Sequence, residues 1–122
     1  MGNPVLFFEI LASDQTKVQN FYSELFGWSI NTDNPNKYGF VNTNSDKGIQ
    51  GGIGHAELTG KNKVLVYVEV DNFETYIKKA KELGGKVIME PTVLIGYSIA
   101  MIADTEGNVT GLILPQRPPQ NK

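Results

Sequence analysis

The chain has 122 residues, of which 40% are hydrophobic and 20% charged, and its formal net charge is −2. This length and composition predict one globular domain with enough apolar material for a core. The acidic balance and the lack of a basic run argue against a nucleic-acid partner, and no apolar stretch is long enough for a membrane span or a secretory signal. The absence of cysteine excludes disulfides and thiolate chemistry. We therefore expect a cytoplasmic protein with no membrane partner.

The first half of the chain predicts a strand, a helix and three further strands. Residues 5–10 form the apolar run of a buried strand. An apolar stripe at helical spacing follows, formed by Val18, Phe21, Tyr22, Leu25 and Phe26. Ser13 or Asp14 is the expected N-cap of this helix, and Gly27 lies just beyond its end. Strands are predicted over residues 28–32, 38–43 and 51–58, with a turn at 33–36.

The second half repeats this pattern. Every second residue of 64–70 is valine, which predicts a strand whose valines pack on the helices; these residues are Val64, Val66, Val68 and Val70. Asp71 and Glu74 have the spacing of a capping box for a second helix, which Gly84 and Gly85 end. Strands are predicted at 86–89, 97–103 and 108–114, with a hairpin turn at 104–108 and a flexible tail at 116–122.

The sequence also contains an internal repeat. Residues 23–30 align with 81–88 at an offset of 58, and residues 48–53 align with 107–112 at an offset of 59. Half a chain of this size cannot bury its own sheet, so the two copies are expected to share one core. We therefore predict a single domain over residues 1–115, built from modules at about 4–58 and 62–115.

Motifs in this order and spacing resemble the vicinal oxygen chelate superfamily, which includes glyoxalase I, bleomycin-resistance proteins and extradiol dioxygenases. The motifs are Phe8-Glu-Ile10, Asp14, Phe21-Tyr22, Leu25-Phe-Gly-Trp28, Gly51-Gly-Ile53, Leu83-Gly-Gly85 and Asp104-x-x-Gly-Asn108. The resemblance implies an α+β fold of two tandem βαβββ modules, with a curved mixed sheet around a cavity that binds a small molecule. It also implies a homodimer.

Metal-dependent members of that superfamily hold a divalent ion with side chains from four strand positions. Transferred to this sequence, the positions are Phe7, Gly52, Leu65 and Gly111, and none of these side chains can coordinate a metal. The resemblance therefore predicts that the usual metal site is absent and that no cofactor is bound. Gly52 and Gly111 are expected to leave room for a ligand.

Strand alternation predicts which polar side chains face the same side as Phe7 and Leu65. They are Glu9, Gln50, Tyr67 and Glu69, set in an otherwise apolar lining that is typical of a small-molecule site. The two glutamates could bind a cation, act as a general base or hold a metal in an unusual way; alternatively, they lie in solvent or pair with lysine. Tyr67 could contact a ligand or simply pack in the core. Glu9 and Tyr67 are the catalytic candidates.

The single histidine, His55, alternates to the opposite face from Gly52, which favours a structural or surface role. The leading hypothesis is thus a metal-free protein that encloses a small molecule. The alternative is a glyoxalase-like lyase or isomerase that is metal-independent or has displaced metal ligands. An interaction module without pocket chemistry is the third hypothesis.

Overall fold

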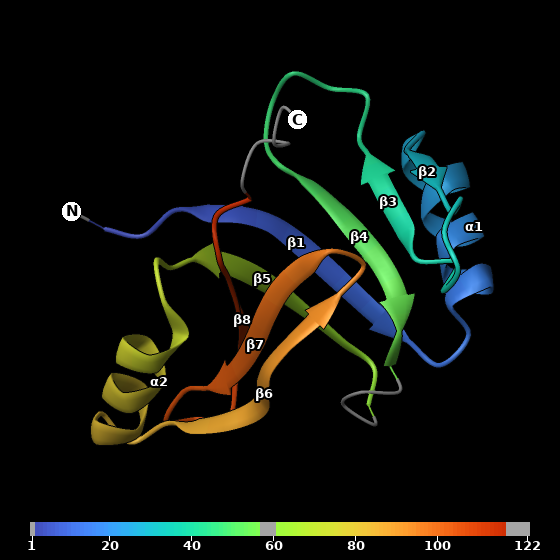
Figure 1. The fold of residues 1–122 in the computed structure, drawn as a ribbon. Helices are drawn as coiled ribbons and strands as arrows, with labels where there is room; N and C mark the ends of the chain where they lie inside the picture. The colour runs from blue at the N-terminus through green and yellow to red at the C-terminus, as the bar shows by residue number, and fades with distance from the viewer. Residues whose placement is uncertain (1, 57–60, 117–122) are drawn as a thin grey trace. The chain divides into compact units, whose positions relative to one another are not determined.

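The computed structural model describes residues 2–56 and 61–116, and within them it has two helices and eight strands (Figure 1). The elements are β1 (Val5–Ala12), α1 (Gln15–Phe26), β2 (Ser29–Asn31), β3 (Gly39–Asn42), β4 (Gln50–His55), β5 (Lys63–Glu69), α2 (Phe73–Glu82), β6 (Lys86–Leu94), β7 (Tyr97–Ala103) and β8 (Val109–Ile113). The mixed α+β class is confirmed, and the order of a strand, a helix and three strands occurs twice.

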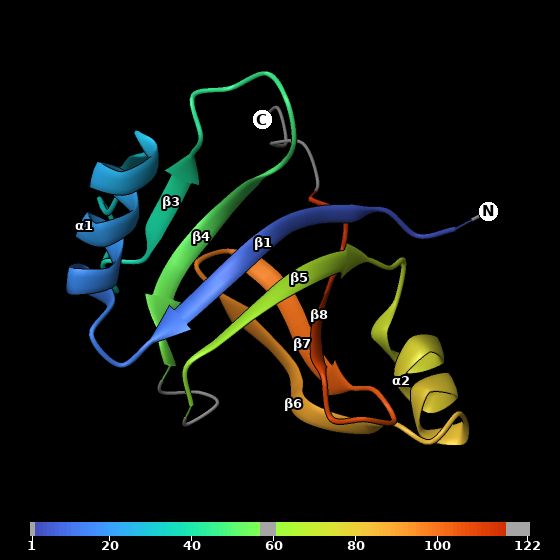
Figure 2. The same cartoon turned by 180° about the vertical axis from the view of Figure 1, so that it is seen from behind.

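The chain divides into two compact units, and the first comprises Leu6–Tyr67. Its strand order is β2-β3-β4-β1-β5. β1 runs parallel to β4, whereas β3 is antiparallel to both β2 and β4, so the sheet is mixed (Figure 2). The parallel pairing follows from the helical crossover between β1 and the later strands.

Helix α1 covers one face of this sheet and begins and ends where the sequence predicts. The Asp14 carboxylate accepts a hydrogen bond from the Lys17 backbone N–H at 3.1 Å, and Gly27 adopts the left-handed conformation (φ 72°). The core between helix and sheet is formed by Ile10, Val41 and Ile53, with Phe8, Val18, Tyr22, Trp28 and Ile30 packed against it. The even-numbered residues of β1 therefore point toward α1.

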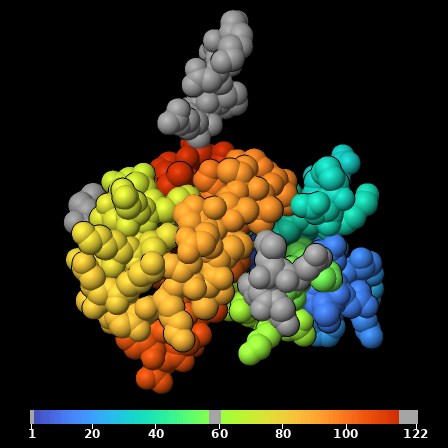
Figure 3. Space-filling model, turned by 60° about the horizontal axis from the view of Figure 1, so that its bottom comes forward, coloured from blue at the N-terminus to red at the C-terminus, as the bar shows by residue number. Residues whose placement is uncertain are grey.

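The second unit comprises residues 1–5 and 68–122, with strand order β8-β7-β6. Helix α2 packs against β6 and β7, and its atoms lie directly against theirs in Figure 3. The predicted cap at Asp71 is wrong by one residue, because Asn72 is the N-cap and accepts from the Thr75 backbone N–H at 2.8 Å. β6 is longer than predicted because register shifts around Met89 let the strand continue.

The expected packing of the β5 valines is wrong at its first two positions. Val64 is 69% exposed and Val66 is 37% exposed, so neither lies under a helix. Alternation identified the strand correctly, but it does not tell whether another element covers the second face. The 104–108 hairpin turn is confirmed, since the Asp104 carboxylate accepts from the Glu106 and Asn108 backbone N–H groups.

Two predicted features, the end of the strand at 57–58 and the tail from 117 onward, lie outside the described residues. Neither α1 nor α2, the helices of the described part of the chain, is long and apolar enough to cross a membrane.

Candidate functional site

A buried carboxylate, Glu9, lies at the centre of the candidate site in the first unit. Glu9 is an odd-numbered residue of β1, so its side chain points to the face of the sheet opposite α1. It is 7% exposed. The Tyr67 hydroxyl donates a hydrogen bond to Oε1 at 2.9 Å, and the Tyr38 hydroxyl donates one to Oε2 at 2.7 Å. Each carboxylate oxygen is thus held by a different tyrosine.

Tyr67 is fixed on two sides. It is 1% exposed, and its ring stacks on that of Phe7, with centroids 4.7 Å apart and planes 15° from parallel. Phe7 and Glu9 are neighbours on the same face of β1, so one strand supplies both the ring that orients Tyr67 and the acceptor for its hydroxyl. The stacking on Phe7 and the hydrogen bond to Oε1 together orient the Tyr67 side chain.

Tyr38 reaches Glu9 because Gly52 has no side chain. Gly52 is paired with Glu9 on one side and with Phe40 on the other, which puts the three residues in one row across the sheet. A Cβ at position 52 would lie 1.9 Å from the Tyr38 hydroxyl oxygen, and one at Gly54 would lie 2.7 Å from the ring. The expectation that Gly52 leaves room for a ligand therefore needs correction, since the Tyr38 ring fills that space.

Burial changes the acid–base behaviour of this cluster. Desolvation raises the pKa of Glu9 above its ordinary value, and this effect exceeds the opposing effect of the two tyrosine hydrogen bonds. Burial, the nearby Glu9 charge and the hydrogen bond to Glu9 together raise the pKa of Tyr67. The cluster thus contains a tyrosine that stays neutral and a carboxyl group that holds its proton to a higher pH than an exposed glutamate.

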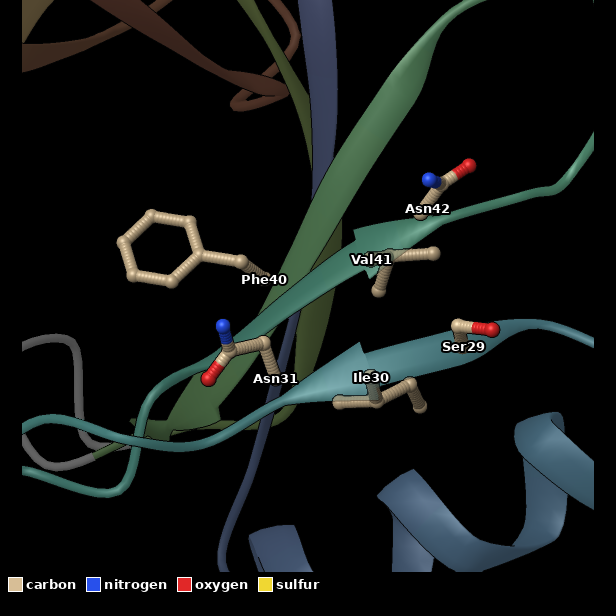
Figure 4. Close-up of a pocket in the computed structure, with 6 residues that line it drawn as sticks. All are labelled: Ser29, Ile30, Asn31, Phe40, Val41 and Asn42. Carbon is tan, nitrogen blue, oxygen red and sulfur yellow. The ribbon is translucent and has the colours of Figure 1, made fainter.

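A hollow of about 370 Å³ lies at the edge of the sheet formed by β2 and β3. Its lining residues are Ser29, Ile30, Asn31, Phe40, Val41 and Asn42. Figure 4 shows Ile30 and Val41 pointing toward the helix side, whereas the Phe40 ring extends to the other side. The Phe40 ring meets the Tyr38 ring edge to face at 5.0 Å, so one lining residue of the hollow contacts a tyrosine that holds Glu9.

The other predicted site residues have different surroundings. Gln50 is exposed, and its side chain binds the Thr43 backbone N–H at 2.7 Å across the β3–β4 connection. Leu65 is 4% exposed within the first unit. Glu69 is half-buried and Gly111 is buried, and both belong to the second unit.

Tyr38 is the site residue that the sequence prediction missed. It precedes Phe40 by two residues, and Phe40 is paired with Gly52. Strand alternation therefore places the side chains of Tyr38 and Phe40 on the same face of the sheet. Two glycines on the neighbouring strand, Gly52 and Gly54, mark the space that a large ring can fill. This combination of a tyrosine and facing glycines is the sequence signal that could have identified it.

The residues at the expected metal positions do not fit a divalent ion. Phe7, Gly52 and Leu65 offer no side-chain donor atoms on the face that carries Glu9, and Gly111 offers none in the second unit. Among the residues that the structure describes, no group of three or more His, Cys, Asp or Glu side chains could hold a metal. Both oxygens of Glu9 already accept tyrosine hydrogen bonds.

With this fold, the chain belongs to the Glyoxalase/Bleomycin resistance protein/Dioxygenase superfamily, whose family model matches residues 5–112. A hypothetical protein from Bacillus halodurans C-125, BH1468, is similar in structure, with a TM-score of 0.68 at 16% identity over 99% of this chain and 100% of that one. A superfamily member from Vibrio splendidus 12B01 gives 0.60 at 13% identity, covering 93% and 98%. Methylmalonyl-CoA epimerase from Mycobacterium tuberculosis gives 0.60 at 15%, covering 93% and 88%. No curated protein matches the chain.

Proposed function

We propose that this chain is a small-molecule-binding protein of its superfamily, that it works without the usual divalent metal, and that Glu9 is the polar group its ligand meets. The observation that carries the proposal is the buried Glu9 carboxylate, whose partners among the described residues are two tyrosine hydroxyls. A buried carboxylate is costly unless a charge or several donors compensate it. Two neutral hydroxyls compensate it in part, which favours a ligand that brings a positive charge or a further donor.

The aromatic rings around Glu9 favour a ligand with an apolar body. Phe7 and Tyr67 form one stacked pair, and Tyr38 and Phe40 form a second pair in edge contact. Aromatic faces attract cations as well as apolar groups, and the hollow beside Phe40 is of the size that small ligands occupy. A small alkylamine that carries an aromatic ring and is protonated at neutral pH therefore has the chemistry that this site fits best.

Access to Glu9 requires Tyr38 to move, since the carboxylate is 7% exposed. Tyr38 lies just before β3 rather than within a strand, whereas Tyr67 lies inside β5. We expect the ligand donor to replace the Tyr38 hydroxyl at Oε2 while the Tyr67 hydroxyl stays at Oε1.

A thermal-shift series tests this proposal, with benzylamine, benzyl alcohol and benzoate as probes of similar size. Binding to the native state raises the melting temperature, so benzylamine should stabilise the wild-type chain most and benzoate least. Glu9→Gln should remove the preference for the amine. Equal shifts for wild type and Glu9→Gln, or a preference for benzoate, would contradict the assignment. Elemental analysis of protein purified without chelators tests the metal-free part, and a stoichiometric transition metal would overturn it.

The raised pKa of Glu9 favours a second activity, a metal-independent isomerase or lyase, because a carboxylate with a raised pKa is a better general base near neutral pH. Glu9 would take the proton from a carbon beside a carbonyl group, leaving an enolate, and return it to that carbon. The similar structures include methylmalonyl-CoA epimerases, although a likeness at this identity concerns the fold alone. Solvent deuterium entering α-hydroxyketone probes, with no exchange by Glu9→Gln, would support this activity. Exchange at the uncatalysed rate would exclude it for these probes.

A further inference from the structure

A groove of about 330 Å³ lies in the second unit, where the last turns of α2 meet the end of β7. The Glu9 cluster and the hollow beside β2 and β3 belong to the first unit, so different residues form this groove. Its lining comes from α2, from the connection to β6 and from the 104–108 turn. The lining residues are Tyr76, Lys79, Ala80, Leu83, Gly85, Ile102, Ala103, Asp104 and Thr105.

Small residues line the part of the groove where the helix end meets the sheet. A Cβ at Gly85 would lie 2.5 Å from the Ala103 carbonyl oxygen, so the connection after α2 packs directly against β7. The Gly85 N–H donates to the Ala80 carbonyl at 2.8 Å. This N–H and this carbonyl are therefore paired within the fold, and the alanine methyl groups are what this part offers a ligand.

Larger apolar groups form the rest of the lining. Leu83 is 68% exposed, and Ile102 is half-buried. The Tyr76 hydroxyl accepts a hydrogen bond from the Asn3 side-chain amide at 3.1 Å, so the ring of Tyr76 rather than its hydroxyl is left for the groove. A ligand chain that covers Leu83 removes apolar surface from water, which stabilises the bound state.

Lys79 supplies the charge that a ligand meets in this groove. The Asp104 carboxylate also belongs to the lining, but its Oδ1 atom accepts from the backbone N–H groups of Glu106 and Asn108. Its Oδ2 atom accepts from the Asn108 side-chain amide at 3.0 Å. Lys79 is exposed, and residues 78–86 contain four lysines and one glutamate in a chain of net charge −2. The α2 side of the groove therefore favours an anion.

We infer that this groove binds a linear aliphatic carboxylate, such as a medium-chain fatty acid, with its alkyl chain on Ala80, Leu83 and Ile102 and its carboxylate at Lys79. The aliphatic lining selects the chain, and the lysine selects the charge of the head group. Residues 79 and 83 are four apart and lie on one face of α2, so a single ligand contacts both.

NMR titration of the isotope-labelled chain with sodium hexanoate and octanoate tests the inference, with octylamine as the probe of opposite charge. The largest amide shifts should fall in residues 79–85 and 102–105. Each methylene that enters the groove should tighten binding about fourfold, so octanoate should bind about 15-fold more tightly than hexanoate. No shifts with millimolar octanoate, largest shifts elsewhere in the chain, or tighter binding of octylamine would overturn the inference.

Lys79→Gln and Lys78→Gln form a matched pair, because both lysines are exposed and adjacent but Lys79 alone lines the groove. At physiological ionic strength, Lys79→Gln should weaken octanoate binding about two- to fivefold, and Lys78→Gln should leave it nearly unchanged. Equal affinities of these two variants would contradict the contact between the carboxylate and Lys79.

Leu83→Ser and Leu25→Ser are the corresponding pair for the alkyl chain, since the two leucines are 68% and 57% exposed but Leu25 belongs to the first unit. Leu83→Ser should weaken octanoate binding about threefold or more, and Leu25→Ser should not change it. Both positions are exposed, so both variants should fold. Octanoate binding that is unchanged in Leu83→Ser would show that the chain does not lie in this groove.

Discussion

Adding one methyl group at Gly52 should disconnect Tyr38 from Glu9. In the structure a Cβ at this position would lie 1.9 Å from the Tyr38 hydroxyl oxygen and 2.4 Å from Cζ, and neither distance is tolerable. The ring of Tyr38 must therefore move in Gly52→Ala, and its hydroxyl must leave Oε2 of Glu9. The variant thus changes the site without touching either hydrogen-bonding residue.

The expected cost combines strain with a lost hydrogen bond. Overpacking costs about 1 to 3 kcal/mol, and a hydrogen bond to a charged group contributes about 1.5 to 3 kcal/mol. Movement of the Tyr38 ring relieves part of the strain, so Gly52→Ala should lower the free energy of unfolding by about 2 to 4 kcal/mol. In a Tyr38→Ala background the ring is absent, and the same methyl group should cost less than about 1 kcal/mol.

A double-mutant cycle measured by urea unfolding tests this reasoning. The coupling between positions 38 and 52 should be about 2 kcal/mol. In a Tyr38→Phe background the ring is present but its hydroxyl is absent, so Gly52→Ala should cost the strain alone and no hydrogen bond. Gly85→Ala is a suitable control, since its Cβ would lie 2.5 Å from the Ala103 carbonyl oxygen in the other unit. That cost should be the same with or without Tyr38. If Gly52→Ala also costs the same in both backgrounds, the Tyr38 ring does not occupy the space at Gly52.

Three further predictions follow from the same unit. Because burial raises the pKa of Glu9 above its ordinary 4.5, wild-type stability should fall as the pH rises from about 4.5 through the folded-state pKa; urea unfolding of Glu9→Gln across this range should lack that fall. Because its pKa is raised, Tyr67 should ionise at a higher pH than exposed tyrosines in an alkaline absorbance titration. This high-pH component should be smaller by one tyrosine in Tyr67→Phe, and an unchanged titration would refute the prediction. The buried Gln19 amide donates to the carbonyls of Ile53 at 2.9 Å and Lys37 at 3.2 Å, so Gln19→Met should cost about 1 to 3 kcal/mol; thermal unfolding at the wild-type midpoint would contradict it.

Alternation along the strands explains how much of the site could be predicted. The side-chain period of two placed Phe7 and Glu9 on one face of their strand and Tyr67 on one face of another, and the structure brings these three side chains together. The period is a property of the backbone and needs no tertiary information. The repeat added a check, since Glu9 and Tyr67 are separated by the same 58 residues that relate the two modules.

The remaining features depend on which element or side chain packs against a residue in the folded chain. The side-chain period of a strand does not contain that information. Val64 and Val66 belong to a strand as predicted, yet they are exposed because no helix of the described residues covers them. Tyr38 lies next to the short strand β3, and its ring contacts residues that are close only after β1, β3 and β4 have paired. A glycine was interpreted as empty space, although a neighbouring side chain fills it.

The most direct test of the proposed function is the dissociation constant of benzylamine for the wild-type chain and for Glu9→Gln, measured by isothermal titration calorimetry at neutral pH. A contact between the ammonium group and Glu9 predicts binding about tenfold to hundredfold weaker in the variant, because a charge-assisted hydrogen bond contributes about 1.5 to 3 kcal/mol. Benzyl alcohol should show a smaller difference between the two proteins. Equal dissociation constants for benzylamine would contradict the assignment of Glu9 as the group that meets the ligand.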